Sequence, residues 1–130
     1  MAGVRLEELT DDKCMVSVPY KWLTQNPFRS VYFACLQMAG EMSTGLLAYS
    51  HVYESNPRVS MLVVNMKSEF LKKADERIYF TCEDVKKIQE AVIRAKQSGE
   101  AQVVEANTTG RTKSGIEVAR FIINWSFKRR

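Results

Sequence analysis

The hydrophobic positions of the chain form one long continuous segment and several shorter alternating ones. Residues 31–49 carry apolar or small side chains on nearly every side of a helical wheel, which is typical of a helix enclosed by other structure. The residue before a proline is disfavoured in the helical conformation, so we expect this helix to begin after Pro27, with Ser30 as its N-cap. It should end between Tyr49 and Glu54.

Alternation of apolar and polar residues predicts β-strands through most of the remaining chain. The predicted strands cover residues 4–10, 13–20, 58–71, 76–82, 100–108 and 115–128. The face of the last strand that should point at the core consists of Glu117, Ala119, Phe121, Ile123, Trp125 and Phe127. Residues 84–99 predict an amphipathic surface helix that Asp84 caps and Gly99 ends. This order favours a single domain, residues 1–130, in which one antiparallel sheet curls around the long helix.

Composition and charge exclude several classes of function. A net charge of +4 without a dense basic stripe argues against nucleic-acid binding. The long apolar segment contains Glu41 and two glycines, so we do not expect it to enter a membrane. The first residues do not resemble a signal peptide, and we expect a cytoplasmic protein. Three widely spaced cysteines and the single histidine, His51, form no ligand pattern, so we expect no metal and no cofactor.

Glu41 is the chemically informative residue of the long helix. It is the only charged residue between Arg29 and Glu54, and burying an unpaired carboxylate costs several kcal/mol by rough estimate. Two interpretations follow. Glu41 is either satisfied by a partner such as Asn26, Thr44 or an arginine of a second copy, or it faces a cavity in which it has a chemical role.

The sequence resembles the hotdog-fold thioesterases that act on acyl-CoA, in particular the phenylacetate type. Three stretches carry the resemblance: Asn26-Pro27-Phe28 with the helix as far as Glu41, then Phe70-Leu71-Lys72-Lys73-Ala74, then Gly115-Ile116-Glu117-Val118-Ala119. The resemblance extends to the order of elements over nearly the whole chain. It implies an α+β hotdog fold, with an antiparallel sheet wrapped around a long central helix and an additional surface helix.

The same resemblance implies roles for individual residues. Glu41 would activate water or attack the thioester carbon directly, and Asn26 would orient the water or the loop that precedes the helix. The main-chain N–H of Phe33 would stabilise the oxyanion, and Ser30 and Tyr32 belong to the same loop. Tyr32-Phe33-Ala34 occupies the positions of a His-Gly-Gly run in the family.

The implied substrate is an acyl-CoA or a related acyl-carrier thioester. Met38 and Met42 would line its acyl tunnel, while Arg111 and Lys113 would bind the phosphates of CoA or remain ordinary solvated charges. The resemblance also implies a homodimer or a dimer of dimers with its site between subunits. The alternative function is a non-catalytic protein that binds an acyl group or acyl-CoA without turnover.

Overall fold

A computed structural model describes residues 3–20 and 33–130 of the chain. Its elements follow the predicted order: β1 (Arg5–Leu9), β2 (Cys14–Val18), α1 (Phe33–Val52), β3 (Val59–Phe70), β4 (Ile78–Cys82), α2 (Val85–Ser98), β5 (Gln102–Arg111) and β6 (Glu117–Arg129). The predicted start of the long helix, with its Ser30 cap, lies outside the described residues. Its predicted end is confirmed at Val52.

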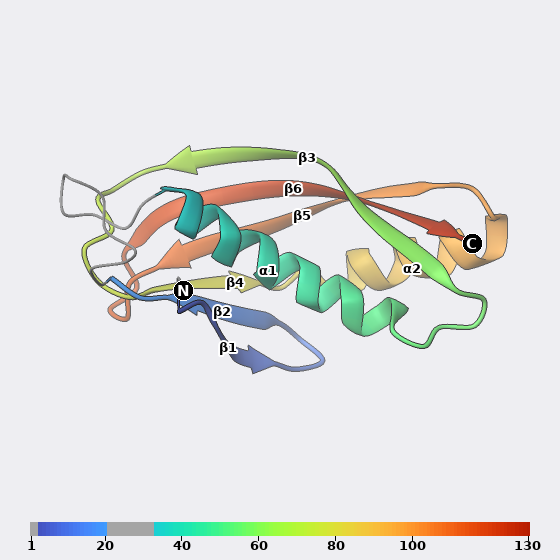
Figure 1. Cartoon of the computed structure of the whole chain (residues 1–130), viewed down its shortest axis with the longest axis horizontal. Coiled ribbons are helices and arrows are strands. Elements are labelled where there is room, and N and C mark those ends of the chain that lie inside the picture. Colours follow the sequence, from blue (N-terminus) through green and yellow to red (C-terminus); the bar gives the residue numbers. More distant parts are fainter. Residues whose placement is uncertain (1–2, 21–32) are drawn as a thin grey trace.

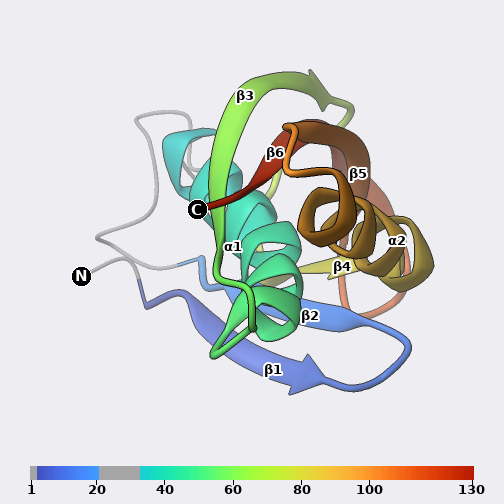
Figure 2. The ribbon, with the colours of Figure 1, turned by 90° about the vertical axis from the view of Figure 1, so that its right-hand side faces the viewer.

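One six-stranded sheet contains every strand, in the order β1-β2-β4-β5-β6-β3. All neighbouring strands run antiparallel. The sheet is strongly curved, so that α1 lies along its concave side with β3 on one flank and β1 on the other (Figures 1 and 2). The curled sheet around a central helix was therefore predicted correctly, and β1 and β3 form its two edges.

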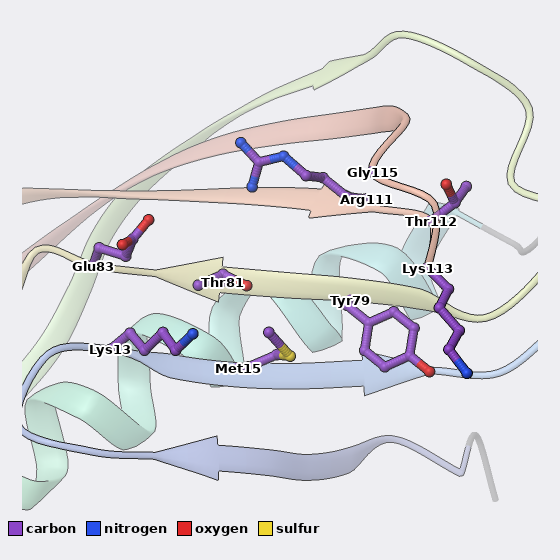
Figure 3. A pocket seen from close by; sticks show the side chains of 9 residues that line it. All are labelled: Lys13, Met15, Tyr79, Thr81, Glu83, Arg111, Thr112, Lys113 and Gly115. Carbon is purple, nitrogen blue, oxygen red and sulfur yellow. The ribbon is translucent and has the colours of Figure 1, made fainter.

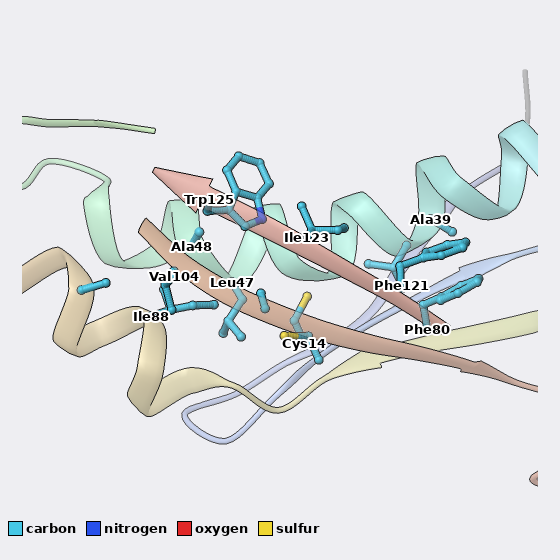
Figure 4. Packing of buried hydrophobic residues seen from close by; sticks show 14 of the residues in the cluster. Cys14, Ala39, Leu47, Ala48, Phe80, Ile88, Val104, Phe121, Ile123 and Trp125 are labelled. Carbon is cyan, nitrogen blue, oxygen red and sulfur yellow. The ribbon is translucent and has the colours of Figure 1, made fainter. Parts of the chain in front are cut away.

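The core lies between α1 and the concave face of the sheet. As predicted, β6 directs one apolar face inward, and Phe121 is 1% exposed. The ring of Phe121 stacks on that of Phe80 from β4, with centroids 5.2 Å apart and an interplanar angle of 12°. Gly40 of α1 packs directly against the Phe121 ring. Figure 4 shows these side chains between the helix and the strands.

Two buried hydrogen bonds fix the rotation of α1 against the sheet. The hydroxyls of Ser43 and Thr108 lie 2.6 Å apart, which joins the helix to β5. The indole N–H of Trp125 donates to the hydroxyl of Thr44 over 2.9 Å, which joins the helix to β6. Buried polar groups need such partners, so the two bonds favour one orientation of an otherwise apolar helix.

The second helix, α2, lies beside α1 and covers the ends of β5 and β6 with an apolar stripe of Ile88, Ala91, Val92 and Ala95. Gly99 ends it in the left-handed conformation, as predicted. The prediction that the Asp84 side chain caps the helix was wrong. Its carboxylate instead accepts hydrogen bonds from the main-chain N–H of Asn107 (2.7 Å) and from the amide of the same side chain (3.2 Å). No helix in residues 3–20 and 33–130 is long and apolar enough to span a membrane.

Candidate active site

The sheet leaves one face of α1 uncovered, which the sequence did not predict. Met38, Tyr49 and Tyr53 are 44%, 51% and 59% exposed on this open face. Towards the C-terminal end of the helix, the face borders an apolar hollow of about 330 Å³, which Leu46 of α1 and Leu9 of β1 also line. The central helix of this chain is therefore enclosed on one side and available for contact on the other.

Glu41 lies half-buried at the margin of the open face. One turn further along the helix is Gly45, whose lack of a side chain lets the indole of Trp125 approach the helix beside the carboxylate. A Cβ at Gly45 would lie 3.8 Å from Oε2 of Glu41 and 3.2 Å from Cζ2 of Trp125. The acid, the glycine and the indole edge of Trp125 therefore lie close together on this side of the helix.

The Glu41 carboxylate has no hydrogen-bond or ion-pair partner among residues 3–20 and 33–130. The sequence suggested Thr44 as such a partner. Its hydroxyl instead donates to the main-chain oxygen of Glu41 (2.9 Å) and accepts from Trp125. A carboxylate that is partly desolvated and free of partners is suited to act as a general base or as a nucleophile.

The other residues predicted for this site are placed only in part. Phe33 is the first described residue of α1, and its ring packs edge-on against Phe70 of β3, with centroids 6.2 Å apart. Met38 and the half-buried Met42 lie on the same side of the helix as Glu41. Asn26, Ser30 and Tyr32 lie outside the described residues, so their roles remain predictions.

Arg111 and Lys113 are not brought together with Glu41 within one chain. They stand at the end of β5 and in the following turn, and they border a hollow of about 510 Å³. Figure 3 shows this hollow on the convex face of the sheet, with α1 behind the strands. Their role in substrate binding remains a prediction, because the sheet separates them from the open face of α1.

His51 lies ten residues beyond Glu41, or about 15 Å along the helix axis. It is half-buried, and burial together with the nearby charge of Lys96 lowers its pKa. It is therefore remote from Glu41. No group of three or more potential metal ligands occurs in the described part of the chain.

Sequence reasoning identified Glu41 and the inward direction of Trp125, but it did not place Gly45 and Trp125 beside the carboxylate. The spacing of Glu41 and Gly45, one helical turn apart, was a usable signal, because residues four apart share a helix face. The position of Trp125 depends on how β6 crosses the helix, which no local pattern reveals.

Comparison with known proteins supports the fold. Residues 1–127 match the model of a family described as a domain of unknown function, DUF4442. None of the curated proteins matches the chain. A solved structure from Pseudomonas aeruginosa, described as a probable thioesterase, superposes with a TM-score of 0.86 at 19% identity, covering 99% of this chain and 85% of that one.

Two further structures show the same architecture. A protein of unknown function from Chlorobaculum tepidum has a TM-score of 0.84 at 13% identity, covering 99% of this chain and 84% of its own. A thioesterase from Haemophilus influenzae has a TM-score of 0.76 at 12% identity, covering 98% and 80%. The chain has the hotdog fold of these proteins, and by its sequence it belongs to the DUF4442 family.

Proposed function

We propose that the protein hydrolyses the thioester of an acyl-CoA or of another acyl carrier, with Glu41 as its catalytic carboxylate. The observation that carries the proposal is the half-buried Glu41 carboxylate, which has no partner among the described residues and lies at the margin of the open face of α1. Thioesterases among the similar structures support the reaction class.

In the proposed reaction, the Glu41 carboxylate is the base or nucleophile and water is the second reactant. Glu41 accepts a proton from water as the water oxygen attacks the thioester carbon. The C–S bond then breaks, and the proton passes to the sulfur, leaving a carboxylic acid and a free thiol. In the covalent variant, Glu41 itself attacks the carbon and expels the thiolate, and water then hydrolyses the resulting anhydride. Phe33 would contribute its main-chain N–H to the oxyanion, and Asn26 would orient the water.

The acyl chain would lie along the open face of α1. Met38 and Met42 flank Glu41 there, and Leu46 continues the apolar surface towards the hollow next to β1. Methionine side chains adapt to irregular apolar shapes. This surface therefore suits an acyl group better than a strongly polar substrate.

We also propose that the working form is a homodimer, alone or as half of a dimer of dimers. β3 is a twelve-residue edge strand on which Leu62 and Val64 are 68% and 52% exposed. Long apolar edges normally pair with something. β3 also flanks the open face of α1, since Gln37 donates to Ser68 over 3.0 Å. A second copy on this edge would cover the neighbouring helix face and complete the site between subunits.

The test is hydrolysis of acetyl-, octanoyl-, palmitoyl- and phenylacetyl-CoA, followed by chromatographic measurement of free CoA. At least one thioester should be hydrolysed, and Glu41→Gln should lower kcat by roughly 10²-fold or more, since it keeps the shape but removes the base. Glu90→Gln is the matched control, because this glutamate is exposed on α2. Both variants should keep the unfolding temperature of the wild type.

Full activity in Glu41→Gln would refute the assignment of the catalytic residue. If the wild-type protein releases no CoA but its unfolding temperature rises with an acyl-CoA, the non-catalytic binding function is correct instead. Measurement of the molar mass in solution tests the dimer separately, and a monomer would contradict it.

A further inference from the structure

A hollow of about 350 Å³ lies between the C-terminal end of α1 and the beginning of β3. Tyr49 and Tyr53 of α1 line it, and the same two residues also line the apolar hollow of about 330 Å³ next to β1. Figure 2 shows α1 between β3 and β1, with the C-terminal end of the helix towards the viewer. The two hollows therefore adjoin at this pair of tyrosines. Together they form what we call the transverse groove, which crosses the helix from β3 to β1.

The β3 end of the transverse groove carries two arginines. Arg58 precedes β3 and Arg130 follows β6, and both line this end. They are neighbours because the main-chain N–H of Arg130 donates to the carbonyl of Arg58 over 2.9 Å. Neither guanidinium forms an ion pair or a hydrogen bond with another residue of the described chain. Glu54 is the one acid among the lining residues, so this end has an excess of positive charge.

Ser55 lines the same end and has a polar group without a partner. Its hydroxyl oxygen is the one buried side-chain polar atom in residues 3–20 and 33–130 that forms no hydrogen bond. Buried hydroxyls nearly always have a partner, and an oxygen atom of a ligand beside Ser55 would supply one. Glu54, the preceding residue, has a φ of 51°, and such strained backbone recurs at ligand sites. Free guanidinium donors suit a carboxylate, which can accept two of them at once.

The rest of the transverse groove is apolar. The rings of Tyr49 and Tyr53 have their centroids 5.5 Å apart and are tilted by 49°, so they give the middle of the groove a continuous aromatic surface. Leu46 of α1 and Leu9 of β1 line the hollow beyond them. Aromatic and aliphatic surfaces of this kind suit a hydrocarbon chain. The groove is therefore cationic at one end and apolar at the other.

We propose that the transverse groove binds a free fatty acid. Arg58 and Arg130 bind the carboxylate, and the chain crosses Tyr49 and Tyr53 to reach the hollow next to β1. The carboxylate does not lie at Glu41, because Tyr49 is eight residues further along the helix, or roughly 12 Å along its axis. The fatty acid shares only the hollow next to β1 with the acyl group of a thioester. It would therefore inhibit hydrolysis by competition, and this consequence, unlike the binding itself, rests on the proposed function.

Isothermal titration of the full-length protein with octanoate, decanoate and dodecanoate tests the site without any thioester. The Kd should fall roughly two- to fourfold with each added methylene, since each one buries more apolar surface. Acetate supplies the charge without the chain, and decanol supplies the chain without the charge. Both should bind at least tenfold more weakly than decanoate. Decyltrimethylammonium, which carries the opposite charge, should bind more weakly still.

The variants Arg58→Ala and Arg130→Ala should each weaken decanoate binding roughly tenfold, as expected for the loss of one charge-assisted contact. They should leave the affinity for decanol unchanged. Lys128→Ala is the matched control, because Lys128 is an exposed cation near the end of β6 that does not line the groove. It should leave the Kd of decanoate unchanged. Equal unfolding temperatures of the three variants establish that a loss of binding is not a loss of fold.

The proposal is wrong if decanol binds as tightly as decanoate, or if Lys128→Ala weakens binding as much as Arg58→Ala. It is also wrong if no fatty acid binds. If the protein that binds none is a dimer in solution, a second copy covers the groove instead. Hydrolysis of thioesters by the Glu41 variants is measured separately, so failure of one proposal leaves the other intact. Where hydrolysis occurs, decanoate should raise KM without changing kcat, and Arg58→Ala should relieve this inhibition.

Discussion

The two glycines of α1 allow helix propensity and core packing to be compared at matched positions. Glycine within a helix costs roughly 1 kcal/mol relative to alanine. Propensity alone therefore predicts that Gly40→Ala and Gly45→Ala each stabilise the protein by about the same amount. The environments of the two positions in the folded protein differ sharply.

At Gly40, an added Cβ would overlap the Phe121 ring and lie 2.5 Å from its Cε2 atom, closer than real contacts allow. The ring cannot move aside easily, because it stacks on Phe80 and meets Phe70 edge-on, with centroids 5.7 Å apart. Overpacking of this kind costs about 1–3 kcal/mol, and the severity of the overlap places it near the upper end. After the gain in propensity, Gly40→Ala should be destabilised by roughly 2 kcal/mol.

At Gly45, the nearest atoms of Trp125 lie 3.2 and 3.4 Å from the added Cβ. A shift of a few tenths of an ångström relieves this contact, so Gly45→Ala should be neutral or stabilised by up to about 1 kcal/mol. Thermal unfolding followed by circular dichroism measures both variants. At roughly 4 °C per kcal/mol for a domain of this size, Gly40→Ala should unfold roughly 8 °C below the wild type.

The reasoning is refuted if Gly40→Ala is as stable as Gly45→Ala, since helix propensity would then outweigh the contact with Phe121. A double variant identifies the cause of any loss. In the background of Phe121→Leu, which leaves room for the added methyl group, Gly40→Ala should cost much less than it does alone. An unchanged cost would place the strain elsewhere in the helix.

Two further predictions concern buried polar and thiol groups. Thr44→Val should lower the free energy of unfolding by about 1–3 kcal/mol, because the buried indole N–H of Trp125 loses its acceptor. Thr44→Ser, which keeps the hydroxyl, is the control in urea titrations. An equal loss of stability in both variants would contradict the prediction. Burial raises the pKa of Cys14 from an ordinary 9.0 to about 11 and that of Cys82 to about 12, so the native protein holds protons that the unfolded chain releases above pH 9. The contribution of these thiols to stability is complete below pH 9 and is lost as pH rises towards 11–12. Urea unfolding at pH 8, 9 and 10 should show this decline in stability, and a variant with both cysteines replaced by alanine should show less of it. A free energy of unfolding that does not change over this pH range would contradict the prediction.

Periodicity predicted those parts of the fold in which one side of an element is buried and the other is not. The inward face of β6 and the buried Ile78, Phe80 and Cys82 of β4 follow directly from alternation.

Asp84 shows where a local rule fails. Its position favours a helix cap, but Asn107, twenty-three residues away, offers two donors to the same carboxylate. Such a partner is visible only after β5 has been placed beside α2.

The placement of Arg111 was partly predictable. The inward residues of β5 continue as Val104, Ala106, Thr108 and Gly110, so the next residue must face outward. The predicted strand ended at residue 108, three residues before Arg111, so the outward direction of Arg111 was not predicted. The alternation was predicted correctly, and only the predicted length of the strand differed from the structure.

The open face of α1 could not be predicted, because a helix that is apolar all round has the same sequence whether a sheet or a second chain covers it. The structure shows which side of the helix is buried and which side is left exposed. Leu47 and Ala48 are buried by the protein's own sheet, whereas Met38 and Tyr49 on the opposite side are exposed. Both side chains are about half exposed, so covering them would contribute roughly half of the 1.5–3 kcal/mol expected for full burial of each. The exposed residues flank the one unpartnered acid of the helix, so a second copy or a bound acyl group that covers them would also enclose Glu41. Covering the face would therefore stabilise the protein and desolvate its candidate catalytic group in the same step.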